Sequence, residues 1–183
     1  YNCQGCHQIE NRGGQLVNTI SAPEYAPPNL NSEGRKVQPD WLLSFFNNPS
    51  IIRPNLQVRM PSFHQIPDKE WNTIIRYFQY IDSEKISYRG EFAFDNNSIE
   101  YHAGEKLHEL GACNNCHFYG ETFPTQEAST WAPNLAMMKE RLNPEWVKEF
   151  LRDPQAIMPG TKMPAPYLPD KDILAMDGAE NDW

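Results

Sequence analysis

Two copies of the pentapeptide Cys-x-x-Cys-His contain every cysteine of the chain. The copies are residues 3–7 and residues 113–117, and all four cysteines of the sequence lie in them. Side chains at helical positions i, i+3 and i+4 share one face. Two thiols can therefore bond to one edge of a flat ring while the imidazole that follows approaches its centre. This spacing is the attachment signature of c-type haem, so the sequence predicts two covalently attached haem c groups.

Each pentapeptide would supply two attachment cysteines and one iron ligand. His7 and His117 are the predicted proximal ligands, each through one ring nitrogen. The predicted attachment residues are Cys3, Cys6, Cys113 and Cys116.

Two other uses of paired cysteines fit less well. A single zinc ion takes four Cys or His ligands, but more than a hundred residues separate the two pairs and a histidine follows each. A thiol–disulfide centre of the thioredoxin kind does not need two copies with trailing histidines, and the chain lacks the βαβ pattern of that fold.

The charge of the chain is unevenly distributed. The net charge is −8, and residues 82–183 contain eighteen Asp and Glu against nine Lys and Arg. Residues 1–81 are nearly neutral, with six acidic and seven basic side chains. Nucleic acid is therefore not an expected partner. A basic patch on a redox partner would complement this acidity, although the acidic side chains also serve simply to keep a surface soluble.

The apolar runs of the chain are short. Residues 41–43 and 45–46 are typical, and no run approaches the ~20 residues that cross a bilayer. No membrane span is therefore predicted. The chain begins with tyrosine and shows no signal peptide, so we expect it to be processed or to be part of a longer polypeptide.

One order of segments occurs twice along the chain. The matching pairs are residues 25–30 and 131–135, 38–49 and 143–154, 59–61 and 162–164, and 66–70 and 168–172. In the second pair an acidic residue follows a proline, apolar residues recur at helical spacing, and another proline ends the run, so each segment predicts a helix. The last pair predicts two further helix starts.

The two repeats differ at their ends. A closing helix with an apolar stripe is predicted after Pro67, from Trp71, Ile74, Ile75, Phe78 and Ile81. Its counterpart after Pro169 is interrupted by Asp177-Gly178. A leading helix, 103–110, with Leu107 and Leu110 packing inward, precedes the second pentapeptide, whereas two residues precede the first. We expect a first module at 1–81 without its leading helix, a linker at 82–101, and a second module at 102–183 with an incomplete closing helix. Either a longer polypeptide or a neighbouring subunit is expected to supply the missing helices.

Each half resembles a small all-helical cytochrome c module of the His/Met type. The resemblance rests on the Cys-x-x-Cys-His motif, the Pro-Asn-Leu turn, the Trp-bearing helix, the Met-Pro pair and the closing helix, in that order. It implies an all-α fold of two tandem domains, each wrapped around its haem. It also implies single-electron transfer in an oxidising compartment, periplasmic or otherwise outside the cytoplasm.

Met60 and Met163 are the predicted distal ligands, because they occupy equivalent places in the repeat and a thioether is a soft donor to haem iron. Packing in the core is the ordinary role of methionine. Met137 and Met138 are expected to lie in a helix just after the Pro-Asn-Leu turn and to pack against the haem or the core. Met158-Pro159 is a rival to Met163-Pro164. His64, and less so His102 and His108, are alternative iron ligands.

The resemblance gives further residues a role in binding haem. A ligating histidine donates its other N–H to an acceptor, and in the family the proline of the Pro-Asn-Leu turn, here Pro28 or Pro133, supplies that carbonyl. Both prolines are otherwise ordinary turn residues. Trp41 and Trp146 are expected to pack against the haem edge and are placed to donate an indole N–H to a propionate.

The resulting hypothesis is an electron carrier, not an enzyme, that acts as a module or subunit of a larger respiratory assembly. Its partners would be redox proteins or subunits of a membrane complex. A dihaem peroxidase is the alternative, because it also has two such motifs, but it needs one iron with a displaceable or absent sixth ligand. A high-spin signal and peroxide turnover would favour the alternative.

Overall fold

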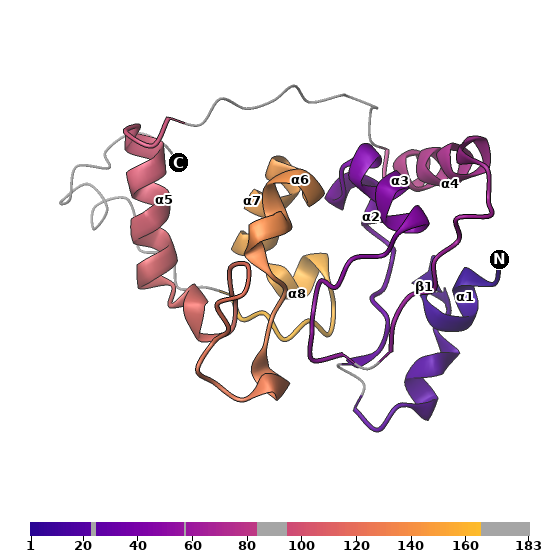
Figure 1. Cartoon of the computed structure of the whole chain (residues 1–183), viewed down its shortest axis with the longest axis horizontal. Helices are drawn as coiled ribbons and strands as arrows, with labels where there is room; N and C mark the ends of the chain where they lie inside the picture. The colour runs from indigo at the N-terminus through magenta and orange to yellow at the C-terminus, as the bar shows by residue number, and fades with distance from the viewer. Residues whose placement is uncertain (23–24, 57, 84–94, 166–183) are drawn as a thin grey trace.

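Helices make up nearly all the regular structure of the chain in a computed structural model, which describes residues 1–22, 25–56, 58–83 and 95–165 (Figure 1). The elements are α1 Cys3–Cys6, β1 Gln8–Ile9, β2 Arg12–Gly13, η1 Gln15–Thr19, α2 Glu33–Lys36, α3 Pro39–Asn47, α4 Asp68–Ile81, α5 Ile99–Leu110, η3 Cys113–Asn115, η4 Ala128–Thr130, η5 Leu135–Met137, α6 Met138–Arg141, α7 Pro144–Arg152 and α8 Pro154–Ile157. This helical architecture is consistent with a cytochrome c-like fold. No helix in these described ranges is long and apolar enough to cross a membrane.

The helices predicted at equivalent places of the repeat both form. α3 and α7 each begin at a proline, whose fixed φ suits the first helical position. In α7 the Asn143 side chain also accepts a hydrogen bond from the Glu145 N–H, at 3.1 Å, which caps the helix. α4 forms as predicted after Pro67, and it buries Trp71, Ile75 and Phe78.

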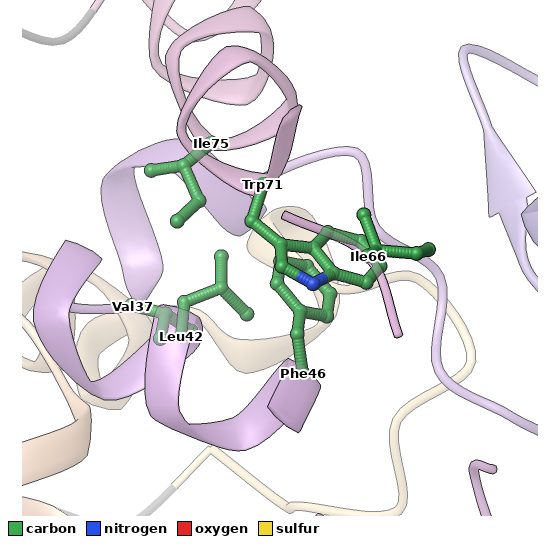
Figure 2. Packing of buried hydrophobic residues seen from close by; sticks show 6 residues of the cluster. All are labelled: Val37, Leu42, Phe46, Ile66, Trp71 and Ile75. Atoms are coloured by element: carbon green, nitrogen blue, oxygen red, sulfur yellow. The ribbon is translucent and has the colours of Figure 1, made fainter. Parts of the chain in front are cut away.

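The largest packed core lies in the first half, between α3 and α4. The side chain of Trp71 lies flat on Phe46, with ring centroids 4.1 Å apart and planes at 14° (Figure 2). The other buried members are Val37, Leu42, Ile66 and Ile75. Met60 packs against this cluster, so the cluster supports the loop that carries the predicted distal ligand.

α2 packs so closely on α4 that its glycine is required there. A Cβ built on Gly34 would lie 2.2 Å from the Phe78 carbonyl oxygen, far inside van der Waals contact. The Asp82 carboxylate accepts hydrogen bonds from the N–H groups of Gly34 and Arg35, at 2.7 and 3.3 Å. The end of α4 therefore holds the start of α2.

The start of the second half differs from the prediction. α5 begins at Ile99, earlier than the expected 103, because Ser98 caps it by accepting the Tyr101 N–H at 3.1 Å. The last three residues of the predicted linker, 99–101, are therefore helical. Leu110 was expected to pack inward, but its side chain is 52% exposed, which makes that expectation wrong. The predicted helix start at 168–172 lies outside the described residues.

A short hairpin, in which β1 and β2 have two residues each, follows the first pentapeptide and was not anticipated from the sequence. Its turn residues Glu10 and Asn11 both have positive φ, 49° and 64°, which gives the turn the twist that tight hairpins favour. The Tyr77 hydroxyl of α4 donates to the Glu10 carboxylate at 2.8 Å. α4 thus ties the hairpin, and with it the first pentapeptide, to the core.

Segment 36–38 lies beside segment 141–143, so the two halves of the chain are in contact. Val37 and Leu142 form an antiparallel bridge. α6 and α7 accordingly lie next to α2 and α3, with α5 set apart at the far end from the N-terminus (Figure 1).

Candidate haem-attachment sites

The first pentapeptide forms one helical turn, α1. The His7 N–H donates to the Cys3 carbonyl at 2.8 Å, which closes the turn and brings Cys3, Cys6 and His7 to one face. Gly13 of the hairpin lies against this turn with φ of 82°, and a Cβ there would lie 2.4 Å from the Gln4 carbonyl oxygen. The Gly14 N–H donates to the same oxygen at 2.8 Å. The hairpin therefore supports the attachment turn from behind.

The His7 ring is held by the Pro-Asn-Leu turn. Its Nδ1 lies 2.8 Å from the Pro28 carbonyl oxygen. A carbonyl oxygen only accepts hydrogen bonds, so Nδ1 carries a proton, and in the neutral ring with this tautomer Nε2 has the lone pair that binds a metal. The Leu30 N–H donates to the Gln8 carbonyl at 2.9 Å, which fixes the turn to the residue that follows the histidine.

The second pentapeptide repeats this arrangement. The His117 N–H donates to the Cys113 carbonyl at 2.9 Å, and His117 Nδ1 lies 2.8 Å from the Pro133 carbonyl oxygen. The Leu135 N–H donates to the Phe118 carbonyl at 2.8 Å, as Leu30 does in the first half. Burial lowers the pKa of His117 although the Pro133 hydrogen bond opposes this, and the neutral imidazole that results is the form that binds metals.

The cysteines of the two turns are free thiols. None of the four forms a disulfide, and Cys6 is exposed while the other three are half-buried. Burial raises the pKa of the Cys113 thiol. Within the described ranges no three His, Cys, Asp or Glu side chains gather, and a single zinc shared by both pairs would require such a group.

The predicted distal ligands lie in loops. Met60 is half-buried and packs on the first-half core. Arg59 donates to the backbone carbonyls of Arg53 and Pro54, both at 3.1 Å, which ties the Met60 loop to the loop that follows α3. Met163 is also half-buried, and its N–H donates to the Thr161 hydroxyl oxygen at 3.3 Å.

Met158 remains a rival of Met163. Both side chains are half-buried, and the Met158 carbonyl accepts the Thr161 N–H at 3.0 Å. One short loop therefore contains both candidates, and the choice between them stays a prediction. Met137 ends η5 and Met138 begins α6, in the segment where the sequence predicted a helix.

The remaining histidines have other contacts. His64 is exposed, with Nδ1 3.3 Å from the Ser62 hydroxyl, and His102 is exposed beside Glu105 at 3.2 Å. His108 is half-buried and packs edge-on against Tyr119, with ring centroids 5.7 Å apart.

The two tryptophans of the repeat adopt the same local packing. Trp41 stacks on Phe45 and Trp146 on Phe150, each pair with centroids 4.7 Å apart. Trp146 is only 5% exposed, and its indole Nε1 is shielded from solvent with no hydrogen-bond partner in the described part of the chain. A shielded indole N–H needs an acceptor, and a carboxylate of a bound haem would provide one.

The residues present therefore fit a haem group. Each half offers two thiols and an imidazole with Nε2 available, together with a thioether in a nearby loop. Bound haem supplies an iron that gains and loses one electron. Three basic residues of this region were not among those expected from the sequence: Lys36, Arg53 and Arg141. Two of them could have been found from the sequence, because Lys36 and Arg141 occupy equivalent positions of the repeat just before the Trp-bearing helices.

Two comparisons with known proteins gave a match, and the family match lies in the first half of the chain. Residues 1–78 match the family model described as cytochrome C oxidase, cbb3-type, subunit III. The "Cytochrome c oxidase subunit 2" of Bacillus subtilis strain 168 is 39% identical over 83 residues, which cover 40% of this chain and 23% of that relative. The chain thus spans less than a quarter of the relative's length. No solved structure matches.

These matches support a c-type cytochrome. A cytochrome c domain implies electron transfer through a covalently bound haem with iron, and the family match over residues 1–78 includes the first pentapeptide.

Proposed function

We propose that the chain transfers electrons through two covalently attached haems, one in each half. The halves are residues 1–81 and 102–183, joined by 82–101. The observation that supports this most strongly is the repeated hydrogen bond that holds His7 and His117, both at 2.8 Å from a proline carbonyl oxygen. The match over residues 1–78 covers one half, and the repeated geometry extends the proposal to the other.

The ligand set proposed for each iron is one histidine and one methionine. His7 and Met60 would serve the first haem, and His117 and Met163 the second. The Nδ1–H of each histidine donates to its proline, which fixes the ring and makes Nε2 a stronger donor. A thioether ligand beside the imidazole would favour the ferrous state and so raise the reduction potential. With one histidine and one methionine holding each iron, the chain would exchange electrons.

The proposed setting is a respiratory electron-transfer assembly outside the cytoplasm. Support comes from the name of the relative, a subunit of cytochrome c oxidase, which is 39% identical to this chain over 83 residues. The partners would be redox proteins or other subunits of a membrane complex. The excess of acidic residues in the second half would attract a partner with a basic docking patch.

The test is a visible and near-infrared spectrum of the oxidised protein. Two low-spin haems with the charge-transfer band of methionine bound to ferric iron are expected. Met60→His should keep both haems and lower one midpoint potential, because an imidazole stabilises ferric iron better than a thioether does. Tyr80→His, which adds an imidazole at an exposed position of α4, is the matched control and should leave both potentials unchanged.

Two results would contradict the proposal. If Met60→His left both midpoint potentials unchanged, Met60 would not be an iron ligand. A high-spin band at one haem, together with turnover of peroxide, would replace electron carriage by the peroxidase alternative.

A further inference from the structure

The contact between the halves is symmetric in the repeat. The Gln38 N–H donates to the Arg141 carbonyl at 2.9 Å, and the Asn143 N–H donates to the Lys36 carbonyl at 2.8 Å. Lys36 and Arg141 are equivalent positions of the repeat, as are Gln38 and Asn143, so each half makes the same bond to the other. Such exchange of equivalent partners is the mark of a two-fold interface.

The side chains beside these bonds are exchanged in the same way. The Lys36 ammonium lies 5.8 Å from the centre of the Trp146 ring, and the Arg141 guanidinium lies 5.4 Å from the centre of the Trp41 ring. Each half therefore places a cation on the tryptophan of the other half, at a distance typical of cation–π contacts.

The two cations differ in their own partners. Lys36 is buried and forms an ion pair with Glu33 at 3.1 Å. Arg141 makes no ion pair with a described carboxylate, and its Nε is shielded from solvent without a hydrogen-bond partner there. Burial lowers the pKa of Arg141, although Glu33 opposes this and Arg53 adds to it.

Arg53 adds a second unpaired cation to this region. Burial lowers its pKa also, and its side chain is half-buried without an ion pair to any described residue. The Ile52 carbonyl beside it accepts the Asn134 N–H at 3.1 Å, which places Arg53 where the halves meet. Besides burial, Arg53 lowers the pKa of Arg141, and the nearby carboxylate of Glu33 is already paired with Lys36, so a further anion would stabilise these two guanidinium groups, both withdrawn from water.

We propose that Arg53 and Arg141 bind a propionate carboxylate of the first-half haem, so that the second half completes the first half's site. The guanidinium fork matches a carboxylate in shape and charge. Two contacts favour the first-half haem: Arg141 covers Trp41, and Arg59 ties the Arg53 backbone to the Met60 loop. This inference rests on the proposed function, because it requires a haem in the first half.

The consequence is control of one haem's potential by a residue of the other half. A positive charge near a haem favours the ferrous state, because reduction adds one negative charge. Loss of the Arg141 charge should therefore lower the midpoint potential of the first-half haem and leave the other nearly unchanged.

The test is a redox titration of the whole chain with Arg141→Gln. The component that Met60→His shifts in the parent protein is assigned to the first-half haem. In Arg141→Gln the midpoint potential of that component should fall by about 59 mV, which corresponds to a tenfold change in the one-electron ferric–ferrous equilibrium. Arg141→Lys should restore part of the shift, since it keeps the charge but loses the fork. Arg152→Gln, at an exposed position of the same half, is the matched control and should shift neither component.

The outcomes separate this inference from the proposed function. Two haems bound with neither potential changed, or with only the second-half potential changed, would overturn the role of Arg141. A chain that binds no haem in the first half, before any substitution, would overturn the proposed function itself. A shift of equal size in Arg152→Gln would mean that net charge alone acts, and this too would contradict a specific carboxylate site.

Discussion

The two halves share their attachment turns but differ in how those turns are supported. In the first half, α4 closes a core of aromatic and aliphatic residues and also holds the hairpin behind α1. In the described part of the second half, the buried hydrophobic residues are Phe118 and Trp146. Trp146 is covered in part by Lys36, which belongs to the first half.

The same geometry at the two histidines therefore does not require the same packing around the two attachment turns. The bonds from His7 to Pro28 and from His117 to Pro133 have the same length, because each depends on a short loop closed by local backbone hydrogen bonds. The larger-scale support can therefore come from a core in one half and from the neighbouring half in the other.

The largest effect is expected from removing the attachment cysteines of one half. Cys113→Ala with Cys116→Ala should abolish covalent attachment in the second half and leave one haem bound covalently. Cys3→Ala with Cys6→Ala is the matched pair for the first half. Acidified ketone extracts haem that is not covalently bound. The number of haems that stay on the protein is then measured for both variants. Loss of both haems in either variant would contradict two independent attachment turns.

The next largest effect concerns the first-half core. Trp71→Ala should lower the free energy of unfolding by about 3–5 kcal/mol, the usual cost of truncating a large buried aromatic side chain. Trp71 is 1% exposed and stacks on Phe46. Tyr80→Ala is the control on the same helix, since Tyr80 is 83% exposed, and it should change the stability by less than about 0.5 kcal/mol.

Denaturant unfolding of both variants would measure this difference. Equal losses of stability in Trp71→Ala and Tyr80→Ala would contradict a core concentrated between α3 and α4. If Trp71→Ala also displaced the second haem, both halves would depend on the first-half core, which would contradict separate support of the two attachment turns.

The smallest effect is the pH dependence of the free energy of unfolding that arises from Asp82, at the contact of α4 with α2. Burial raises the pKa of Asp82 although the N–H groups of Gly34 and Arg35 lower it. The folded state then holds the proton more tightly than the unfolded state, so this carboxyl adds most stability below its unfolded pKa of about 3.9. That contribution is lost as the pH rises through the higher folded-state pKa.

Asp82→Asn should remove this dependence, because the amide does not titrate and still offers an oxygen to Gly34 and Arg35. The free energy of unfolding, measured between acidic and neutral pH, should fall less steeply with rising pH in the variant than in the parent protein. Glu121→Gln at an exposed position is the control. Identical slopes for Asp82→Asn and the parent would contradict a raised Asp82 pKa.

Much of the helical structure could be predicted because its signals are local. The prolines at 39 and 144 start α3 and α7, and the stripe after Pro67 predicts α4, all from residues close together in sequence. The hairpin at Glu10 and Asn11 was missed because neither residue is glycine, so the usual mark of a tight turn is absent. The early start of α5 depends on Ser98, a cap that lies inside a polar segment.

The contact between the halves could not be predicted from the chain alone. Nothing in the sequence singles out Lys36 or Arg141 as a contact between the halves, and only the three-dimensional arrangement brings each to the tryptophan of the other half. The pattern of the repeat identified equivalent positions but carried no information on how the repeats face each other.

The most direct test of the account is to identify the residues that hold haem in the mature protein. Proteolysis of the oxidised holoprotein, followed by mass spectrometry, should yield two haem-bearing peptides, one with residues 3–7 and one with residues 113–117. That result would establish one covalent haem in each half. Haem on the first peptide alone, with both thiols of the second peptide unmodified, would contradict the account and leave a single-haem cytochrome.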